Sequence, residues 1–219
     1  MSATAEPDLA ALASRYLEAQ LTGDRQRAVQ LLIDDGVMAG VSVSDLLLRV
    51  ITPAQREIGR LWENNEVSVA DEHVATAISQ LAMSHLYSHA APTGLRREHI
   101  VIACVDGEWH DMGARVAADV LEHHGFSVCL LGPSVPIADL LTRVRRESPD
   151  IVLLSVTMPT HVESLKRTFQ ALGQAYPLLP VLVGGRGTTD DPSLAFPLPP
   201  LTADRIAVCA EVERLLLQG

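Results

Sequence analysis

The sequence predicts an α+α/β protein, in which an N-terminal four-helix bundle is followed by a flavodoxin-like (Rossmann-like) doubly wound parallel sheet. Up to about residue 90, apolar residues recur only at helical spacing. Beyond residue 99, short apolar runs alternate with helical segments, which is typical of a parallel sheet covered on both faces. A length of 219 residues and a hydrophobic content of 47% are sufficient for two cores. The expected divisions are a disordered tail at 1–7, the bundle at 8–91, a linker at 92–98 and the α/β domain at 99–219.

The predicted bundle has short connections between its helices, which favours an antiparallel arrangement. Apolar spacing and capping residues place the helices at 8–21, 24–36, 44–62 and 68–89. The last of them begins with a pattern that resembles a capping box, Ser68-Val69-Ala70-Asp71. Pro53 lies inside the third helix and is expected to kink or divide it, because proline lacks the backbone N–H.

The α/β part is predicted to alternate strands with helices. The strands are expected at 100–105, 126–131, 151–156 and 180–183, with a short fifth strand near Leu201. The helices are expected at 113–124, 137–147, 161–175 and 204–217. A flavodoxin-like arrangement has the strand order 2-1-3-4-5, with the ligand at the carboxyl ends of the first and third strands.

Composition excludes several functional classes. The net charge of −10 opposes a nucleic-acid footprint, which requires clustered lysine and arginine. No apolar run approaches the length of a membrane span, and residues 1–8 lack the features of a signal peptide. Cys104, Cys129 and Cys209 show neither metal nor redox spacing, which indicates small buried thiols in a reducing compartment. The sequence therefore predicts a cytoplasmic protein without direct contact to nucleic acid or membrane.

The first candidate site is the stretch from Val105 to Gly113, between the first predicted strand and its helix. It places His110 on a loop at the carboxyl edge of the sheet, and Gly113 permits a close approach. Glu108 can accept the other ring N–H and fix the tautomer, as the partners of metal-bound histidines do. The alternative is a loop histidine satisfied by its neighbouring carboxylate. Most other histidines are expected on solvated faces or at helix ends.

The pattern Glu-x-His-x-x-Gly, from Glu108 to Gly113, resembles the lower-ligand motif of cobalamin-binding domains, which more often begins with Asp. The resemblance implies that His110 is the lower axial ligand of cobalt and that the displaced nucleotide tail enters the sheet. The residues that would line the slot for this tail are Ser155, Thr157, Gly184 and Gly185. The alternatives are ordinary polar residues at a strand end and a dinucleotide loop, but the full glycine fingerprint of such a loop is missing.

A second pattern, Trp-x9-Glu-His, comprises Trp62, Glu72 and His73 and resembles the bundle of light-sensing adenosylcobalamin repressors. There the three residues cover the upper face of the cofactor, which implies a lid over the adenosine here. The alternatives are a core tryptophan and a glutamate that complements a helix dipole. In those repressors a histidine follows the tryptophan and binds cobalt after photolysis. Glu63 stands at this position here, which puts the bis-histidine adduct in doubt.

The two resemblances together imply a photoreceptor that spans residues 8–217. Light would cleave the cobalt–carbon bond of adenosylcobalamin and change the domain arrangement, the self-association or the binding of a partner. A homodimer or homotetramer and a separate regulator acting in trans are expected. No helix-turn-helix pattern precedes the bundle in this sequence, so direct DNA binding is not expected, and neither is an enzyme with its own substrate.

Other functions share this architecture. One alternative is a corrinoid protein that carries methyl groups for a methyltransferase, but such carriers usually have Asp at the first motif position and lack Trp-x9-Glu-His. A cobalamin store or carrier is another. A minority alternative is a photoreceptor that also holds a bilin such as biliverdin, although no cysteine is placed obviously for a covalent bond to it.

Overall fold

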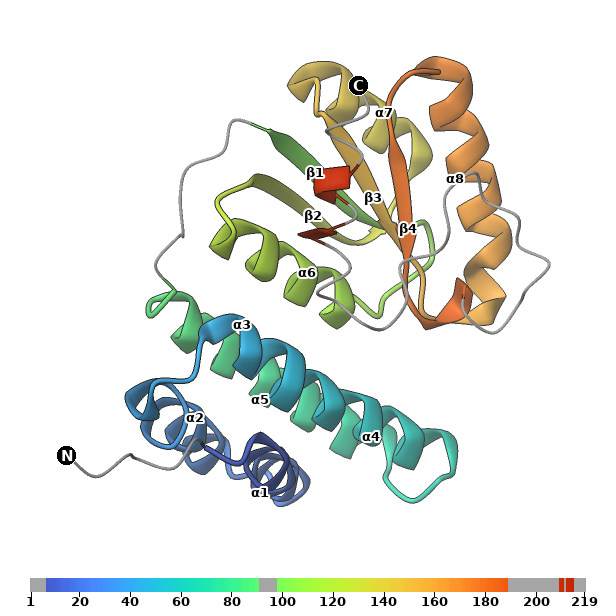
Figure 1. The fold of residues 1–219 in the computed structure, drawn as a ribbon. Helices are drawn as coiled ribbons and strands as arrows, with labels where there is room; N and C mark the ends of the chain where they lie inside the picture. Colours follow the sequence, from blue (N-terminus) through green and yellow to red (C-terminus); the bar gives the residue numbers. More distant parts are fainter. Residues whose placement is uncertain (1–6, 91–97, 189–208, 211, 215–219) are drawn as a thin grey trace. The chain divides into compact units, whose positions relative to one another are not determined.

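The structure is a computed structural model that describes residues 7–90, 98–188, 209–210 and 212–214 (Figure 1). The chain divides into two compact units, Met1–Ala91 and Pro92–Gly219. The first unit is helical and the second contains a parallel sheet with helices, which confirms the predicted fold class. Several expectations lie outside the described residues: the tail at 1–6, nearly all of the linker, the strand near Leu201 and most of the last predicted helix.

The helices of the first unit begin at residues whose side chains accept backbone N–H groups. Asp8, Asp24, Ser42 and Ser68 cap four of them in this way. The helical segments are α1 (Leu9–Leu21), α2 (Arg25–Asp34), η1 (Val37–Ala39), α3 (Val43–Leu46), η2 (Leu47–Ile51), α4 (Thr52–Glu63) and α5 (Val69–Tyr87). Their inward faces bury a core that includes Leu12, Tyr16, Leu31, Leu46, Ile58 and Leu86.

The third predicted helix is divided in its middle, as expected from Pro53. A π-helical segment, η2, separates α3 from α4 directly ahead of Pro53. The wider π-turn accommodates Pro53. Proline has no backbone N–H to donate, and its ring clashes with the carbonyl group four residues earlier in a regular α-helix. The Leu47 carbonyl oxygen accepts both the Thr52 backbone N–H and, at 2.8 Å, the Thr52 hydroxyl, so two donors of one residue meet the same acceptor in this widened turn.

The second unit contains a sheet whose described strands are all parallel, in the order β2-β1-β3-β4. This order agrees with the prediction as far as the described strands reach. The strands are β1 (His99–Val105), β2 (Ser127–Val135), β3 (Ile151–Ser155) and β4 (Val181–Gly184). The helices are α6 (Met112–His123), α7 (Ile137–Glu147), η3 (Pro159–His161), α8 (Val162–Ala175) and η4 (Arg186–Thr188). Residues 209–210 and 212–214 are also helical.

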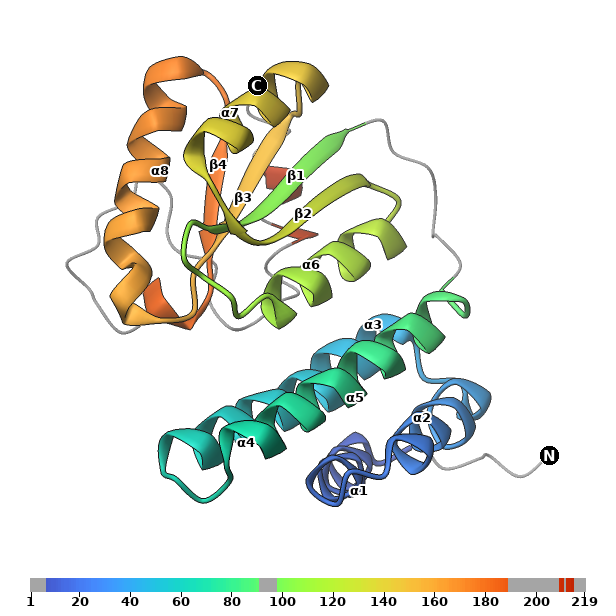
Figure 2. The same ribbon diagram turned by 180° about the vertical axis from the view of Figure 1, so that it is seen from behind.

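The helices cover both faces of the sheet. On one face, α7 and α8 bury a core with β1, β3 and β4 that includes Val101, Leu140, Leu154 and Leu165. On the other face, α6 packs against β2 and β1 (Figure 1, Figure 2). Because β1 and β3 are the central strands, their carboxyl ends meet at one edge of the sheet, where parallel α/β folds bind ligands.

Strand β2 is longer than predicted and continues to Val135. Its register against β1 shifts between Ile102 and Ala103, and again between Ala103 and Val105. Gly132 has φ +87° and Ser134 has φ +48°, so the extra residues are absorbed as a bulge near the carboxyl edge. The Ser134 hydroxyl accepts the Gly107 N–H at 3.1 Å, and this contact ties the bulge to the loop after β1.

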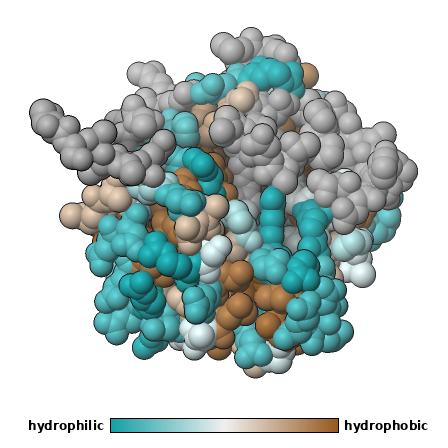
Figure 3. Space-filling view, turned by 60° about the horizontal axis from the view of Figure 1, so that its bottom comes forward, coloured by the Kyte–Doolittle hydropathy of each residue, from teal (hydrophilic) through white to brown (hydrophobic). Residues whose placement is uncertain are grey.

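The described surface carries both hydrophilic and apolar residues. The face in Figure 3 is largely hydrophilic, with smaller apolar patches between the hydrophilic residues. Among the residues that the structure describes, no helix is both long and apolar enough to cross a membrane.

Candidate functional site

The loop between β1 and α6 turns at Gly107, whose φ of +87° favours glycine. The Glu108 N–H donates to the Val105 carbonyl oxygen at 2.9 Å, which closes the turn directly after the strand. The Glu108 side chain then points inward and is fully buried, whereas 71% of Trp109 and 46% of the His110 side chain are exposed. The loop thus presents two aromatic rings above a buried carboxylate.

The Glu108 carboxylate connects two strand ends. One oxygen accepts the backbone N–H of His110 at 2.9 Å and its ring Nδ1–H at 2.6 Å. The other oxygen accepts the backbone N–H groups of Thr157 and Met158, both at 2.8 Å, and contacts His161 Nδ1 at 3.2 Å. The hydrogen bond expected between Glu108 and His110 is therefore present. The same side chain also holds the segment that follows β3.

Electrostatics fix the state of this pair. Burial alone would raise the pKa of Glu108, but hydrogen bonds from the His110 side chain and from the Met158, His110 and Thr157 N–H groups hold this pKa at about 2. The carboxylate is therefore ionised at neutral pH and can only accept, so His110 Nδ1 must be the protonated nitrogen. In this tautomer the lone pair is on Nε2, which is what a histidine needs in order to bind a metal.

Two further buried groups lie behind the loop. The Asp111 carboxylate is 6% exposed and pairs with Arg115, one turn further along α6, at 2.7 and 2.8 Å. The Cys104 thiol lies 4.0 Å from the His110 carbonyl oxygen, and burial, with the negative charges of Asp111 and Glu108, raises its pKa to about 12. Cys104 is therefore a neutral buried thiol, as the sequence predicts.

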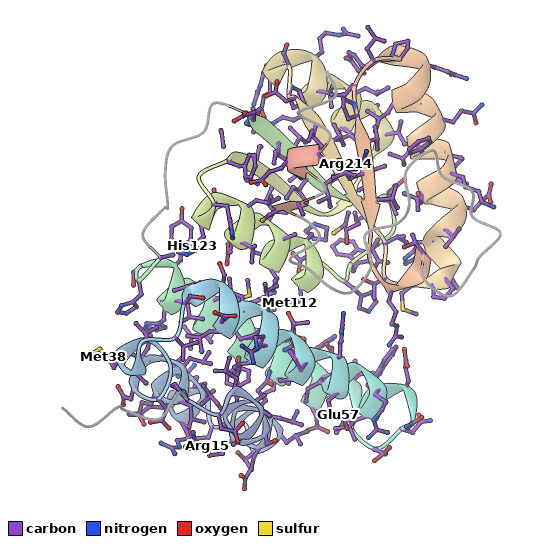
Figure 4. The ribbon with its side chains drawn as sticks, in the orientation of Figure 1. Arg15, Met38, Glu57, Met112, His123 and Arg214 are labelled. Carbon is purple, nitrogen blue, oxygen red and sulfur yellow. The ribbon has the colours of Figure 1, made fainter. Side chains whose placement is uncertain are left out.

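Gly113 and Gly185, near the carboxyl edge of the sheet, differ in what an added side chain would meet. A Cβ on Gly113, the second residue of α6, would meet no atom within 4 Å, so open space lies beside the loop. Figure 4 labels its neighbour Met112 at the start of this helix. A Cβ on Gly185, in contrast, would stand 2.0 Å from the Val156 carbonyl oxygen, and Gly185 has φ +106°. Gly185 is thus required by the packing of the chain itself.

The predicted slot residues meet at the ends of β3 and β4. Ser155 is buried and pairs in register with Cys104 on one side and Gly184 on the other. Thr157 is partly buried, and its backbone N–H is already engaged by Glu108. Ser155, Thr157 and Gly184 therefore lie at the same edge of the sheet as His110.

His161 is a site residue that sequence reasoning missed. The sequence places His161 among the histidines expected on solvated faces or at helix ends, and it does directly precede α8. Its ring, however, contacts the buried Glu108 carboxylate and would lie 3.6 Å from a Cβ on Gly107. Its sequence position could have indicated this role, because it follows shortly after β3, whose carboxyl end was expected to line the ligand crevice.

In the first unit, a short turn links the end of α4, which carries Trp62, to α5. Asn65 is left-handed at φ +59°, and its N–H donates to the Trp62 carbonyl oxygen at 2.9 Å. The Glu66 N–H donates to the Leu61 carbonyl oxygen at 2.8 Å, which completes a Schellman motif. Helix α5 then starts with the predicted capping box between Ser68 and Asp71.

Trp62, Glu72 and His73 therefore lie at one end of the bundle unit, on both sides of this turn. Trp62 is partly buried, and the His73 side chain is 73% exposed. The Glu72 side chain is 25% exposed. One of its oxygens accepts the Thr76 hydroxyl at 2.7 Å, and the other lies 3.7 Å from His73 Nε2.

The donor set suits a metal that needs only one protein ligand. Within the described ranges, no cluster of three or more histidine, cysteine, aspartate or glutamate residues is arranged to hold an ion. A corrinoid supplies its own equatorial nitrogens, and a single oriented imidazole is then sufficient. His110, with its tautomer fixed and open space beside Gly113, fits this requirement.

A helical unit followed by a parallel α/β unit, with one oriented histidine at the carboxyl edge of the sheet, defines a corrinoid-binding class of protein. Residues 98–211 match the B12 binding domain family, and residues 12–87 match a second family described as a B12 binding domain. The chain therefore belongs to the B12-binding domain family.

Its relatives include regulators and corrinoid proteins. The chain is 37% identical to the HTH-type transcriptional repressor CarH of Myxococcus xanthus over 187 residues, which cover 84% of this chain and 60% of the repressor. It is 21% identical to dimethylamine corrinoid protein 3 of Methanosarcina acetivorans, over 83% of this chain and 86% of that protein. The solved monomethylamine corrinoid protein of Methanosarcina barkeri has the same fold, with a TM-score of 0.70 over 82% of this chain and 86% of that chain at 16% identity.

Proposed function

We propose that this chain is a cobalamin-based light sensor that binds adenosylcobalamin and does not itself act as an enzyme. The observation that carries the proposal is the position of Trp62, Glu72 and His73 at one end of the bundle unit, where local caps fix both sides of the turn between them. An indole and two hydrogen-bonding side chains suit an adenosyl group, which offers a flat base and two ribose hydroxyls. The similarity to CarH supports the same assignment.

Each candidate residue has a distinct task in this proposal. His110 would hold cobalt through Nε2, while Glu108 keeps the imidazole in its tautomer and orientation. Gly113 leaves space for the corrin edge, and Ser155, Thr157, Gly184 and Gly185 border the slot for the nucleotide tail. When bound, adenosylcobalamin supplies a cobalt–carbon bond that light breaks.

The upper face is assigned to the bundle unit. Trp62, Glu72 and His73 contact the adenosyl group in the dark and lose that partner after illumination. Glu63 is exposed beside Trp62 and is a weaker partner for cobalt(III) than an imidazole, so His73 or water would fill the position of the departed group. Loss of the adenosyl contacts biases the protein between two states. The output is a change in self-association, as a dimer or tetramer, or in binding to a separate regulator in the cytoplasm.

Limited proteolysis in the dark and after green light tests this proposal. With bound adenosylcobalamin, we expect illumination to change the absorption spectrum irreversibly and to change the cleavage pattern of the bundle unit. Protein loaded with methylcobalamin is the matched control, because a methyl group gives Trp62 and Glu72 no comparable contact. An identical cleavage pattern in all four samples would contradict a light-driven change of state.

A methyl carrier for a methyltransferase is the second candidate, because the corrinoid proteins match the chain over most of both lengths. It predicts that bound methylcobalamin transfers its methyl group to a suitable acceptor when a partner methyltransferase is present, and that light has no consequence for the protein. For the bilin alternative, neither the described side chains nor the comparisons provide support. Extraction of the purified protein, with a corrinoid as the sole chromophore, would dismiss it.

A further inference from the structure

The core of the bundle unit contains a connected set of polar side chains where apolar residues would suffice for packing. We call this set the polar chain; its members are Tyr16, Gln20, Ser79, Gln55, Thr76 and Glu72. Its inner members are almost completely buried, and its outer member is a candidate lid residue. Buried polar groups are costly unless they form hydrogen bonds, and hydrogen-bonded groups favour one arrangement of the helices. Each member of the polar chain bonds to another member, although Gln20 Oε1 itself has no partner among the described residues.

At the inner end of the polar chain, donors and acceptors can be assigned by counting the lone pairs and the single hydrogen of the Ser79 hydroxyl. The Ser79 hydroxyl accepts from the Gln20 amide at 2.9 Å and from the Gln55 amide at 2.7 Å. Both amides also donate to the Ala75 carbonyl oxygen, at 2.9 and 3.3 Å. With both lone pairs used, Ser79 must donate its own hydrogen to the Tyr16 oxygen at 3.0 Å. The Gln55 amide is oriented with Nε2 toward Ser79 and Ala75 and with Oε1 toward Thr76.

At the outer end, the Thr76 hydroxyl stands between two acceptors. It lies 2.7 Å from one Glu72 oxygen and 3.3 Å from Gln55 Oε1. A hydroxyl has a single hydrogen, so it is directed mainly to the nearer and charged acceptor. Thr76 thus fixes one oxygen of the Glu72 carboxylate. Gln55 Oε1 lies on the other side of the Thr76 hydroxyl.

The spacing along the helices places these contacts at the level of the proposed lid. Thr76 follows Glu72 by four residues on α5, which is one helical turn on the same face. Gln55 precedes Trp62 by seven residues on α4, which is two turns on the same face. The polar chain therefore sets the register of α4 against α5, and these two helices carry Trp62 and Glu72.

We propose that Thr76 is a positioning residue that, with Gln55 behind it, holds the Glu72 carboxylate ready for the ribose hydroxyls of an adenosyl group. It thereby sets the preference of the protein for adenosylcobalamin over methylcobalamin. The proposal rests on the proposed function, because it assumes that Glu72 meets the adenosyl group. A methyl group has no hydroxyl to donate, so its binding is insensitive to the orientation of Glu72.

The test is a pair of dark absorbance titrations, with adenosylcobalamin and with methylcobalamin, on the full chain. Thr76→Val removes the hydroxyl at constant volume and should lower the ratio of the two affinities by about three- to tenfold, with the methylcobalamin Kd within about twofold of wild type. Thr76→Ser keeps the hydroxyl and should retain the wild-type ratio. Thr142→Val is the matched control, because this exposed hydroxyl on α7 bonds only within its own helix, to the Ala138 carbonyl oxygen at 2.9 Å.

The outcomes separate this inference from the proposed function. If Thr76→Val keeps the full preference while Trp62→Ala loses it, the lid stands and the role of Thr76 is wrong. An equal loss of both affinities in Thr76→Val would also overturn it, since that is the result of a merely structural defect. If wild type and Trp62→Ala both show no preference, the proposed function itself fails. Should Thr76→Val not fold by circular dichroism, Thr76→Ala provides the same comparison, because it also removes the hydroxyl that donates to Glu72.

Discussion

The loop that carries His110 and the turn between Trp62 and Glu72 are stabilised in different ways. The loop with His110 depends on long-range contacts, because Glu108 is bonded to residues about fifty positions further along the chain. The turn between Trp62 and Glu72 depends on local caps, whose partners lie at most five positions apart. In the proposed function, long-range support suits a cobalt ligand that stays bound, and local support suits a lid whose partner leaves.

The largest expected effect follows from the lower ligand. His110→Ala removes the imidazole, and we expect the cobalamin affinity to fall by about 100-fold or more, because changes to the partners of metal ligands alone cost roughly 10–100-fold. The absorption spectrum of any bound corrinoid should shift with the loss of the axial nitrogen. Absorbance titration measures both. An unchanged affinity together with an unchanged spectrum would show that His110 is not the ligand.

The contrast between long-range and local support is tested by Glu108→Gln. The amide keeps the shape of the side chain but directs N–H hydrogens at donors, so we expect a loss of about 3 kcal/mol in the free energy of unfolding. Ser68→Ala is the matched change at the capped turn and should cost about 1 kcal/mol. Urea unfolding of the apoprotein, followed by circular dichroism, measures both. Equal costs would remove the distinction between the two ends.

A smaller effect is expected at the proposed lid. Trp62→Ala removes an aromatic surface that is already partly exposed, so the bundle should remain folded and methylcobalamin should bind as in wild type. The preference for adenosylcobalamin should fall by about tenfold, in line with the ~1–3 kcal/mol of a base stacked on an aromatic ring. Dark titrations with both cofactors provide the measurement. Equal selectivity in wild type and variant would refute the lid.

The smallest effect concerns pH. The pKa of Glu108 is lowered from 4.5 to about 2 in the folded protein, so its ionised form stabilises the fold above about pH 5. This contribution is lost as the pH falls from about 5 toward 2, and none of it changes near neutrality. Acid titration of the apoprotein by circular dichroism should show a shallower decline for Glu108→Gln than for wild type. Parallel curves would assign the acid sensitivity to other groups.

The same contrast explains what the sequence could predict. Hydrophobic periodicity and capping residues were sufficient for the helices of the first unit and for the order of the described strands. His110 and Glu108 were found because they are two residues apart, and the capping box at Ser68 because it is local. Local patterns do not contain the link from Glu108 to His161, because it arises only when β1 and β3 become neighbours.

Other features escaped prediction for related reasons. The extension of β2 to Val135 depends on a bulge paired against β1, and the sequence of β2 alone shows a glycine and a proline where a strand would end. The π-helical segment before Pro53 is one of several ways to accommodate a proline, and the sequence alone does not distinguish among them. The packing that requires glycine at position 185 also escaped prediction, because a Cβ there would stand 2.0 Å from the Val156 carbonyl oxygen, which is distant in sequence.

Size-exclusion chromatography of the protein reconstituted with adenosylcobalamin, in the dark and after green light, tests the central claim most directly. The account predicts that the illuminated protein elutes at a different volume from the dark protein and does not return after renewed darkness, while the apoprotein is indifferent to light. Identical elution of the dark and illuminated holoprotein, with cobalamin still bound, would contradict a light sensor that acts through assembly and would favour the methyl carrier.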